Sequence, residues 1–397
     1  MLSCRAEFCP ERDAEFFAAI PAKPAVFRLR GGSGSQPYVS KTSNLRRRLI
    51  RLLGQPEQHT RRLNLRGQAE LLEYALTGSD FESTLLLYQL LRESFPRNYL
   101  DRLKLRFAPL VRLHMDNRFP RASVTVRISR LTGPAVFYGP FPSRAAAEKF
   151  ANDSLDFFKM RRCVEKLHPD PAFPGCIYSE MKMCLAPCFK GCTDEEYAAE
   201  VERVRDFFDS GGRSLLRELG AQRDRASTEL DFENAAAIHA RLEKLAPVLN
   251  QLPEVVHRID RLSALMIQPS AEAESVTLFR IEKGRCSEGI RFGLRQESRQ
   301  PHSMEGRLQQ ALTGAPLAAA ASALETMEQL AILRRWYYRT SKTGEIFFAD
   351  ESGEFPWRRI VRAVSRVFRG EKPAPDLSES ARDYWINRGR ESNHADQ

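Results

Sequence analysis

The sequence predicts an α+β protein that consists of several domains. Its 397 residues are enough for two to four domains, each with a hydrophobic core. Strand-like segments separated by glycine-containing turns lie at 25–39 and 274–294. Between them, residues 193–245 show the apolar periodicity of helices. Helices and strands are therefore both expected, in separate parts of the chain.

The composition indicates a soluble protein with a basic surface. Apolar residues make up 42% of the chain and charged residues 28%, and the formal net charge is +10. A basic chain favours a polyanionic partner such as nucleic acid, although many basic proteins bind none. No apolar run approaches the about 20 residues that cross a bilayer, and no secretory signal is visible. We therefore expect a cytoplasmic protein that contacts no membrane.

Residues 14–50 predict a helix or turn, a β-hairpin and a second helix. The apolar run 25–29 and the segment after Pro37 flank the glycine-rich turn 31–35. From Lys41 onward, leucines recur on one side of a helix and arginines crowd the other sides. Those arginines fit a solvated helix face as well as a binding surface.

Cysteines gather in the middle of the chain. They are Cys163, Cys176, Cys184, Cys188 and Cys192. In a reducing cytosol disulfides are not expected, so the pattern predicts either a soft-metal site or buried thiols that act as small apolar residues. The spacing is neither that of a zinc ribbon nor that of a ferredoxin, and both interpretations stay open.

The segment 137–192 contains FYGPFPS, then RRC, and later CLAPC. This combination resembles the central region of the UvrC family, the incision subunit of bacterial nucleotide-excision repair. The resemblance implies a [4Fe–4S] cluster, with zinc or no metal as alternatives. Its ligands would be Cys163, Cys176, Cys184 and Cys188, and Cys192 would be a neighbouring thiol.

The N-terminal segment is similar to the GIY-YIG nuclease domain of the same family. The matching residues are AVF at 25–27 and YVSKTSNLRRRL from Tyr38 onward. The resemblance places Phe27 at the first tyrosine of the motif and Tyr38 at the second. It implies that Tyr38 is the base for water, that Arg48 faces the phosphate, and that Lys41 belongs to the same site.

The metal ligand of that nuclease site is missing from this sequence. The family holds a divalent ion with a glutamate on a later helix, where this chain has Leu87 in one alignment and Tyr88 in another. Neither is a carboxylate, and at ~100° per residue Glu82 and Glu93 project away from position 87. The resemblance therefore gives no ligand for Mg²⁺. We expect the nuclease fold to be retained and its metal chemistry to be lost, with the catalytic residues vestigial or impaired.

Residues 193–250 predict three helices. Thr193 and Glu196 form a capping box that opens a helix ending near the Gly211-Gly212 pair. A second helix follows to about 229, and a tight turn at 230–231 leads into a third. The last two form an antiparallel α-hairpin, with Leu219, Ala226 and Leu230 expected to face Ala235, Ala236, Ile238, Leu242 and Leu245.

The hairpin sequence LDFENAAAIHARLEKL resembles the UVR motif, through which the family docks on UvrB. A generic α-hairpin is the alternative interpretation. The resemblance implies that the partner contacts are made by Phe232, Glu233, Ala235, Ala236 and Arg241.

The C-terminal part predicts a β-meander at 274–294, a linker at 312–322, a helix from about 324 and an amphipathic helix at 357–369. The polar tail after 371 is expected to fray. Arginines on this amphipathic helix and on the N-terminal helix after Lys41 are candidates for contacting DNA phosphates. A solvated basic face is the alternative. These candidates are Arg46, Arg47, Arg358, Arg359, Arg362 and Arg366.

The resemblance divides the chain into four expected parts. They are a GIY-YIG-like mixed α/β domain at 14–107, a strand-rich linker with the Cys-rich cluster-binding region at 108–192, a helical region with the UVR α-hairpin at 193–250, and a C-terminal α/β region at 251–397. The RNase H-like nuclease and helix-hairpin-helix modules of longer members are not recognisable.

Three functions remain as hypotheses. The first is an accessory repair protein that binds damaged double-stranded DNA and UvrB but does not incise. The second is an active endonuclease that makes a single incision on the 3′ side, like the short UvrC homologues known as Cho. The third is a binding scaffold outside repair that uses the hairpin for another partner.

Overall fold

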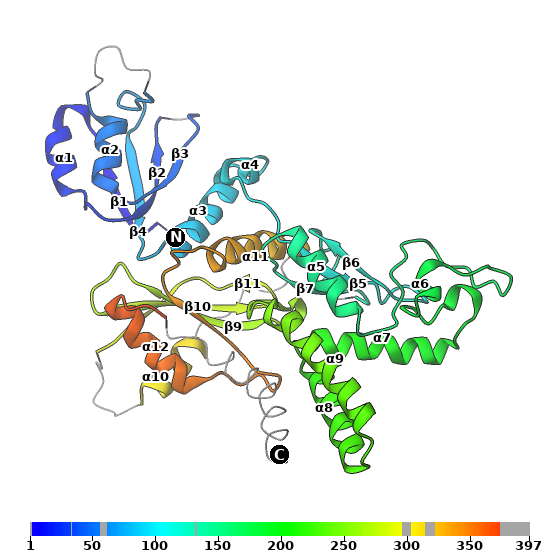
Figure 1. Ribbon diagram of the computed structural model, residues 1–397. Coiled ribbons are helices and arrows are strands. Elements are labelled where there is room, and N and C mark those ends of the chain that lie inside the picture. Colours follow the sequence, from blue (N-terminus) through cyan, green and yellow to red (C-terminus); the bar gives the residue numbers. More distant parts are fainter. Residues whose placement is uncertain are drawn as a thin grey trace.

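The computed structural model describes residues 2–32, 34–55, 62–131, 133–295, 303–313 and 322–373. It is a mixed α+β structure with three separate sheets, as predicted (Figure 1). Within the described ranges, no helix combines the length and the apolar character that crossing a bilayer requires.

The N-terminal lobe is a four-stranded antiparallel sheet with two helices on one face. Its strands have the order β1-β4-β2-β3. The β2–β3 hairpin and helix α2 confirm the prediction for this segment, whereas β1 and β4 were not predicted. The elements are β1 (Cys4–Glu7), α1 (Asp13–Ala19), β2 (Ala25–Arg30), β3 (Tyr38–Thr42), α2 (Leu45–Leu53) and β4 (Leu71–Leu76).

Helix α3 (Asp80–Ser94) connects this lobe to the rest of the molecule. Ser79 caps its N-terminus by accepting a hydrogen bond from the Glu82 amide. Its buried face packs on α11 (Ala323–Tyr337), where Tyr88 and Trp336 lie in one hydrophobic core. This core also takes in α4 (Tyr99–Leu103) and therefore spans the boundary expected near residue 107.

The middle of the chain forms a second four-stranded sheet, with the order β6-β5-β7-β8. A hydrophobic core beneath it is rich in phenylalanine rings, among them Phe150 and Phe207. The loops that carry the central cysteines project at one end of the molecule around α6 (Figure 1). The elements are β5 (Leu110–Leu113), β6 (Ala122–Thr125), β7 (Val136–Gly139), α5 (Arg144–Leu155), α6 (Ile177–Glu180), α7 (Asp194–Asp209) and β8 (His257–Arg258).

The helical region matches the sequence prediction closely. Thr193 and Glu196 form the predicted capping box at the start of α7. The antiparallel hairpin consists of α8 (Arg213–Thr228) and α9 (Phe232–Asn250). Leu230 was wrongly placed in its interface: it lies in the turn, in a left-handed conformation, with 72% of its surface exposed.

The C-terminal sheet contains the predicted β-meander and two unpredicted strands, β9 and β13. Helices α10 and α12 cover one face, and α11 covers the other. Most of the linker expected at 312–322 and of the tail expected at 371–397 lies outside the described residues. The elements are β9 (Ser263–Pro269), β10 (Ser275–Glu282), β11 (Arg285–Cys286), β12 (Ile290–Gly293), α10 (Met304–Thr313), β13 (Glu345–Phe348) and α12 (Trp357–Arg369).

Candidate functional site

Tyr38 and Arg48 meet on the helical face of the N-terminal sheet. The side chain of Asn44 accepts a hydrogen bond of 2.9 Å from the Arg47 amide, which starts α2 directly after β3. Arg48 therefore lies one turn into the helix, beside the strand, and its Nη2 donates to the Tyr38 hydroxyl at 2.7 Å. The Tyr38 ring centroid lies 6.0 Å from that of the fully buried Phe27. The structure thus brings together two of the three predicted nuclease residues.

The third predicted residue, Lys41, points to the opposite face of the sheet. Side chains alternate along a strand, so residues 38 and 41 of β3 project to opposite sides. The Nζ atom of Lys41 donates to Asp80 Oδ1 and to Thr84 Oγ1 of α3, both at 2.7 Å. Lys41 is therefore bound to α3 and separated by the sheet from the Tyr38–Arg48 pair.

The positions that the resemblance assigns to the metal ligand face another part of the molecule. Leu87 is partly buried against the core shared with α11, and the Tyr88 hydroxyl donates to Glu328 at 2.6 Å. The two glutamates of α3, Glu82 and Glu93, accept hydrogen bonds from other groups. Glu82 accepts from the Gly78 amide at 2.7 Å, and Glu93 accepts from Arg28 at 3.0 Å.

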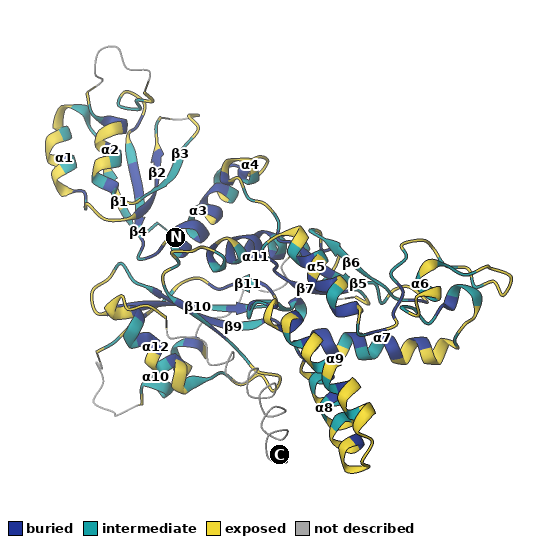
Figure 2. Ribbon diagram, in the orientation of Figure 1, coloured by how far each residue is buried: buried dark blue, intermediate teal, exposed yellow. Residues whose placement is uncertain are grey.

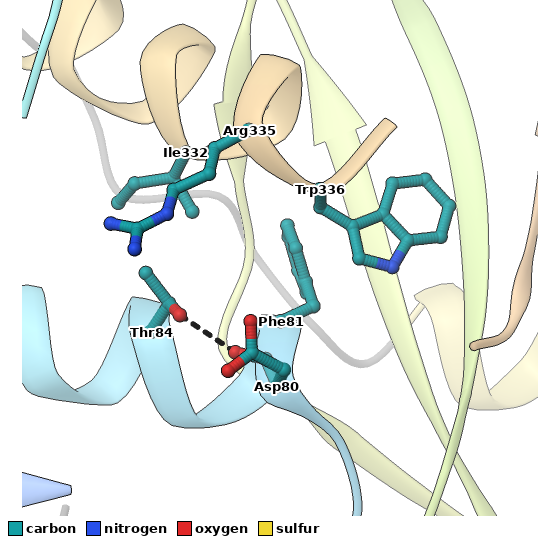
Figure 3. Close-up of a pocket in the computed structure, with 6 residues that line it drawn as sticks. All are labelled: Asp80, Phe81, Thr84, Ile332, Arg335 and Trp336. Carbon is teal, nitrogen blue, oxygen red and sulfur yellow. Dashed lines mark hydrogen bonds between the residues drawn. The ribbon is translucent and has the colours of Figure 1, made fainter. Parts of the chain in front are cut away.

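The sequence analysis missed a charged cluster at the first turn of α3. Asp80 forms ion pairs with Lys41 and with Arg339, which follows α11. A small pocket beside it is shown in Figure 3, with residues from α3 and α11 in its wall. The basic residues at the end of α11 were visible in the sequence. Their proximity to Asp80 was not, because it depends on a contact across more than half of the chain.

The four central cysteines that the resemblance names gather in the projecting loops. Burial and the nearby thiols of Cys163, Cys188 and Cys176 together raise the pKa of Cys184 to about 11, although a hydrogen bond from the Ala186 amide lowers it. Each is a thiol rather than part of a disulfide. Thiols that lie near one another in this way are donors that suit a soft metal.

The thiols do not form a finished coordination shell. Across the residues that the structure describes, no three His, Cys, Asp or Glu side chains are grouped as ligands of one ion. Two of the thiols already have weaker contacts: Cys163 accepts from Arg161 Nη1 at 3.5 Å, and Cys184 accepts from the Ala186 amide at 3.3 Å. Cys192 is half-buried, and burial raises its pKa as well, with Glu196 and Asp194 adding to the effect.

The turn of the α8–α9 hairpin presents two apolar side chains to solvent. Phe232 is 65% exposed and lies two residues after the exposed Leu230, so this surface carries two large apolar side chains. Figure 2 shows the end of the hairpin as exposed ribbon. Of the other predicted contact residues, Ala235 is half-buried between the helices. Those that are exposed are Glu233, Ala236 and Arg241.

The predicted DNA-binding arginines divide into engaged and free side chains. Arg46 donates to the Ile20 and Ala18 carbonyls at 2.6 and 3.2 Å and thereby holds the end of α1. Arg366 pairs with the nearly buried Glu345 through two hydrogen bonds of 2.9 and 2.8 Å.

The guanidinium of Arg359 lies 5.8 Å from the centroid of the Phe347 ring. The remaining three candidates are exposed and have no ion-pair partner among the described residues. They are Arg47, Arg358 and Arg362.

Residues 108–207 match the family model described as the UvrC/Cho excinuclease, middle domain. The match spans β5 to β7, α5, the cysteine loops and most of α7. Residues 108–207 belong to the UvrC family. Its N-terminal lobe and its α8–α9 hairpin adjoin this UvrC middle domain on either side.

Curated relatives agree with this assignment. The UvrABC system protein C of Alkalilimnicola ehrlichii is 27% identical over 270 residues, which cover 68% of this chain and 44% of the relative. The proteins of the same name from Sphingopyxis alaskensis and Rhodospirillum rubrum are 30% and 31% identical over 59% and 58% of this chain. The matches cover 37% and 35% of those two relatives, so the chain spans less than half the length of these UvrC proteins. No solved structure matches the chain significantly.

Proposed function

We propose that this UvrC-family protein is an accessory component of nucleotide-excision repair that binds damaged double-stranded DNA and UvrB but does not incise. The observation that carries the proposal is that α3, with its glutamates, lies on the sheet face opposite the Tyr38–Arg48 pair. A GIY-YIG-type incision needs a carboxylate-held divalent ion beside such a pair. The glutamates of α3 are occupied elsewhere, at Gly78 and Arg28.

Binding to DNA is supported by the charge of the chain and by its free arginines. The net charge of +10 attracts a polyanion over long range. Arg358 and Arg362 lie on the exposed side of α12, and Arg47 lies on α2. Their guanidinium groups are available to phosphates because no carboxylate among the described residues pairs with them.

Binding to UvrB is supported by the end of the hairpin. The apolar side chains of Leu230 and Phe232 gain by burial against a partner, at roughly 25 cal/mol per Å² of apolar surface removed from water. Glu233 and Arg241 are exposed on the same arm and can add polar contacts.

The cysteine loops are proposed to hold a [4Fe–4S] cluster through Cys163, Cys176, Cys184 and Cys188. A thiolate set of this kind is the usual ligand set of such clusters, whose chemistry is one-electron transfer. The proposal is supported by the thiols of Cys163, Cys176 and Cys188, which lie near enough to Cys184 to raise its pKa. Zinc is the alternative occupant, because the same soft donors bind it.

A second candidate function is a single incision on the 3′ side, as in Cho-type proteins. The intact Tyr38–Arg48 hydrogen bond favours it, since a binding role alone does not require that pair.

The proposed function is tested by retention of UvrB on the immobilised full-length chain. We expect wild-type protein to retain UvrB and Phe232→Ala to lose at least tenfold in affinity. Phe368→Ala is the matched control, because Phe368 is also an exposed phenylalanine, 46% exposed, but lies on α12. Wild-type protein that retains no UvrB would instead support the scaffold hypothesis.

A further inference from the structure

Three basic side chains converge where β3, α3 and α11 meet. Lys41 comes from β3, Arg335 from the last turn of α11, and Arg339 from just beyond that helix. Asp80, the first residue of α3, lies among them. Its carboxylate accepts from Lys41 at 2.7 Å through Oδ1 and pairs with Arg339 through Oδ2.

Arg335 is the basic residue of this group that has no ion-pair partner among the described residues. Figure 3 shows its guanidinium extending from α11 toward Thr84, on the side of the pocket where Asp80 also lies. The wall of the pocket is otherwise apolar. Its lining residues are Asp80, Phe81, Thr84, Ile332, Arg335 and Trp336.

The charges of this cluster do not cancel. Burial by itself would raise the pKa of Asp80, but the hydrogen bond from Lys41 and the charges of Lys41, Arg339 and Arg335 lower it overall. Asp80 is therefore ionised at neutral pH, and three positive charges stand against one negative charge. The N-terminal end of the α3 dipole adds further positive potential. A singly charged anion with several acceptor oxygens complements this site, and a phosphodiester has that chemistry.

We propose that Lys41, Arg335 and Arg339 form a binding site for a backbone phosphate of nucleic acid, with Asp80 holding Lys41 and Arg339 in place. The inference rests on the proposed DNA binding and adds a contact that the amphipathic helices do not provide. A strand bound here would touch the N-terminal lobe and α11 together.

The first test measures binding of a fluorescent duplex to the full-length chain by anisotropy over a range of salt concentrations. We expect Arg335→Gln combined with Arg339→Gln to lower the affinity about tenfold at low salt. The slope of log affinity against log salt should fall by about 2, because each lost phosphate contact removes roughly 0.9.

The matched control replaces Arg217 and Arg225, two exposed arginines of α8, by glutamine. It removes the same charge and should change the affinity less than twofold. Equal losses in both double variants would show a general charge effect and overturn the site. The single variant Arg335→Gln checks whether the double variant loses binding through misfolding, because no ion pair among the described residues depends on the Arg335 side chain.

The second test uses inorganic phosphate in place of DNA, at constant ionic strength. Phosphate should raise the Tm of wild-type protein and leave the Tm of the Arg335→Gln, Arg339→Gln variant unchanged. If wild-type protein responds in this way but binds no duplex, the proposed DNA binding is wrong and the phosphate site stands. An equal response of both proteins to phosphate would overturn the site.

Discussion

The Tyr88 hydroxyl donates a hydrogen bond of 2.6 Å to the fully buried carboxylate of Glu328, 240 residues further along the chain. Tyr99 donates to the other oxygen of the same carboxylate at 2.5 Å. Burial, together with these contacts to Glu328, raises the pKa of both tyrosines, that of Tyr99 to about 12. The helix face that the resemblance assigns to the metal ligand here joins α3 to α11.

Tyr88→Phe should therefore destabilise the protein. The substitution keeps the ring but leaves one oxygen of a buried carboxylate without its donor, which costs about 1–3 kcal/mol. The measurement is the free energy of unfolding in urea. Tyr178→Phe is the control, because the hydroxyl of Tyr178 has no partner within the described part of the chain. A loss no larger for Tyr88→Phe than for the control would contradict the account.

Stability should fall in mild acid because of His257. Burial lowers its pKa to about 4, and its ring lies 4.8 Å from that of Phe348. An unfolded histidine has a pKa of about 6.5, so between these values the unfolded chain binds more protons. The contribution of the neutral His257 to the free energy of unfolding is fully present above about pH 6.5. It declines toward pH 4, by up to about 1.4 kcal/mol per pH unit.

His114 contributes in the same direction, since burial and nearby arginines lower its pKa to about 4 as well. His257→Gln should therefore make Tm fall less steeply as the pH is lowered, because unfolding of the variant takes up about one proton fewer. The pH dependence should not disappear. A variant whose Tm falls as steeply as that of wild-type protein would exclude His257 as a cause.

Arg366 and Arg362 should behave differently although both lie on α12. Arg366→Gln leaves Glu345, 9% exposed, without its partner and should cost about 1–3 kcal/mol of stability. Arg362→Gln should leave stability unchanged and weaken DNA binding severalfold. Urea unfolding and duplex anisotropy separate the two effects. If Arg362→Gln is less stable than Arg366→Gln, the distinction between arginines with and without an ion-pair partner is wrong.

Cys184→Ser tests the proposed cluster. Anaerobically purified wild-type protein should be brown and contain iron, and Cys184→Ser should lose both. Cys192→Ser should keep both, because the resemblance leaves Cys192 outside the ligand set. Wild-type protein that is folded, colourless and free of metal would favour the interpretation of buried thiols.

Local sequence signals were sufficient to predict those helices whose N-termini carry a capping residue. The α7 helix begins at its capping box, and the α8–α9 turn was placed correctly because Asp231 caps α9. Strand β4 was missed because its sequence LLEYAL does not alternate. Leu72 faces the helices, while Glu73 is also buried, beneath three arginines on the other face.

The candidate site was only partly predictable. The motif places Tyr38 and Lys41 three residues apart. The alternation of side chains along a strand by itself predicts that they project from opposite faces of the sheet. The position of α3 was not predictable from local patterns, because its partner α11 is more than 200 residues away. Leu230 was misplaced because a helical period was extended through a turn that ends the helix.

The proposed absence of incision is tested most directly by a nicking assay. The full-length chain is incubated with damaged duplex, Mg²⁺ or Mn²⁺, and purified UvrA and UvrB, with Tyr38→Phe as the comparison. The account predicts that wild-type protein nicks no more DNA than Tyr38→Phe does. Metal-dependent nicking by wild-type protein that Tyr38→Phe abolishes would contradict it and establish the Cho-type activity.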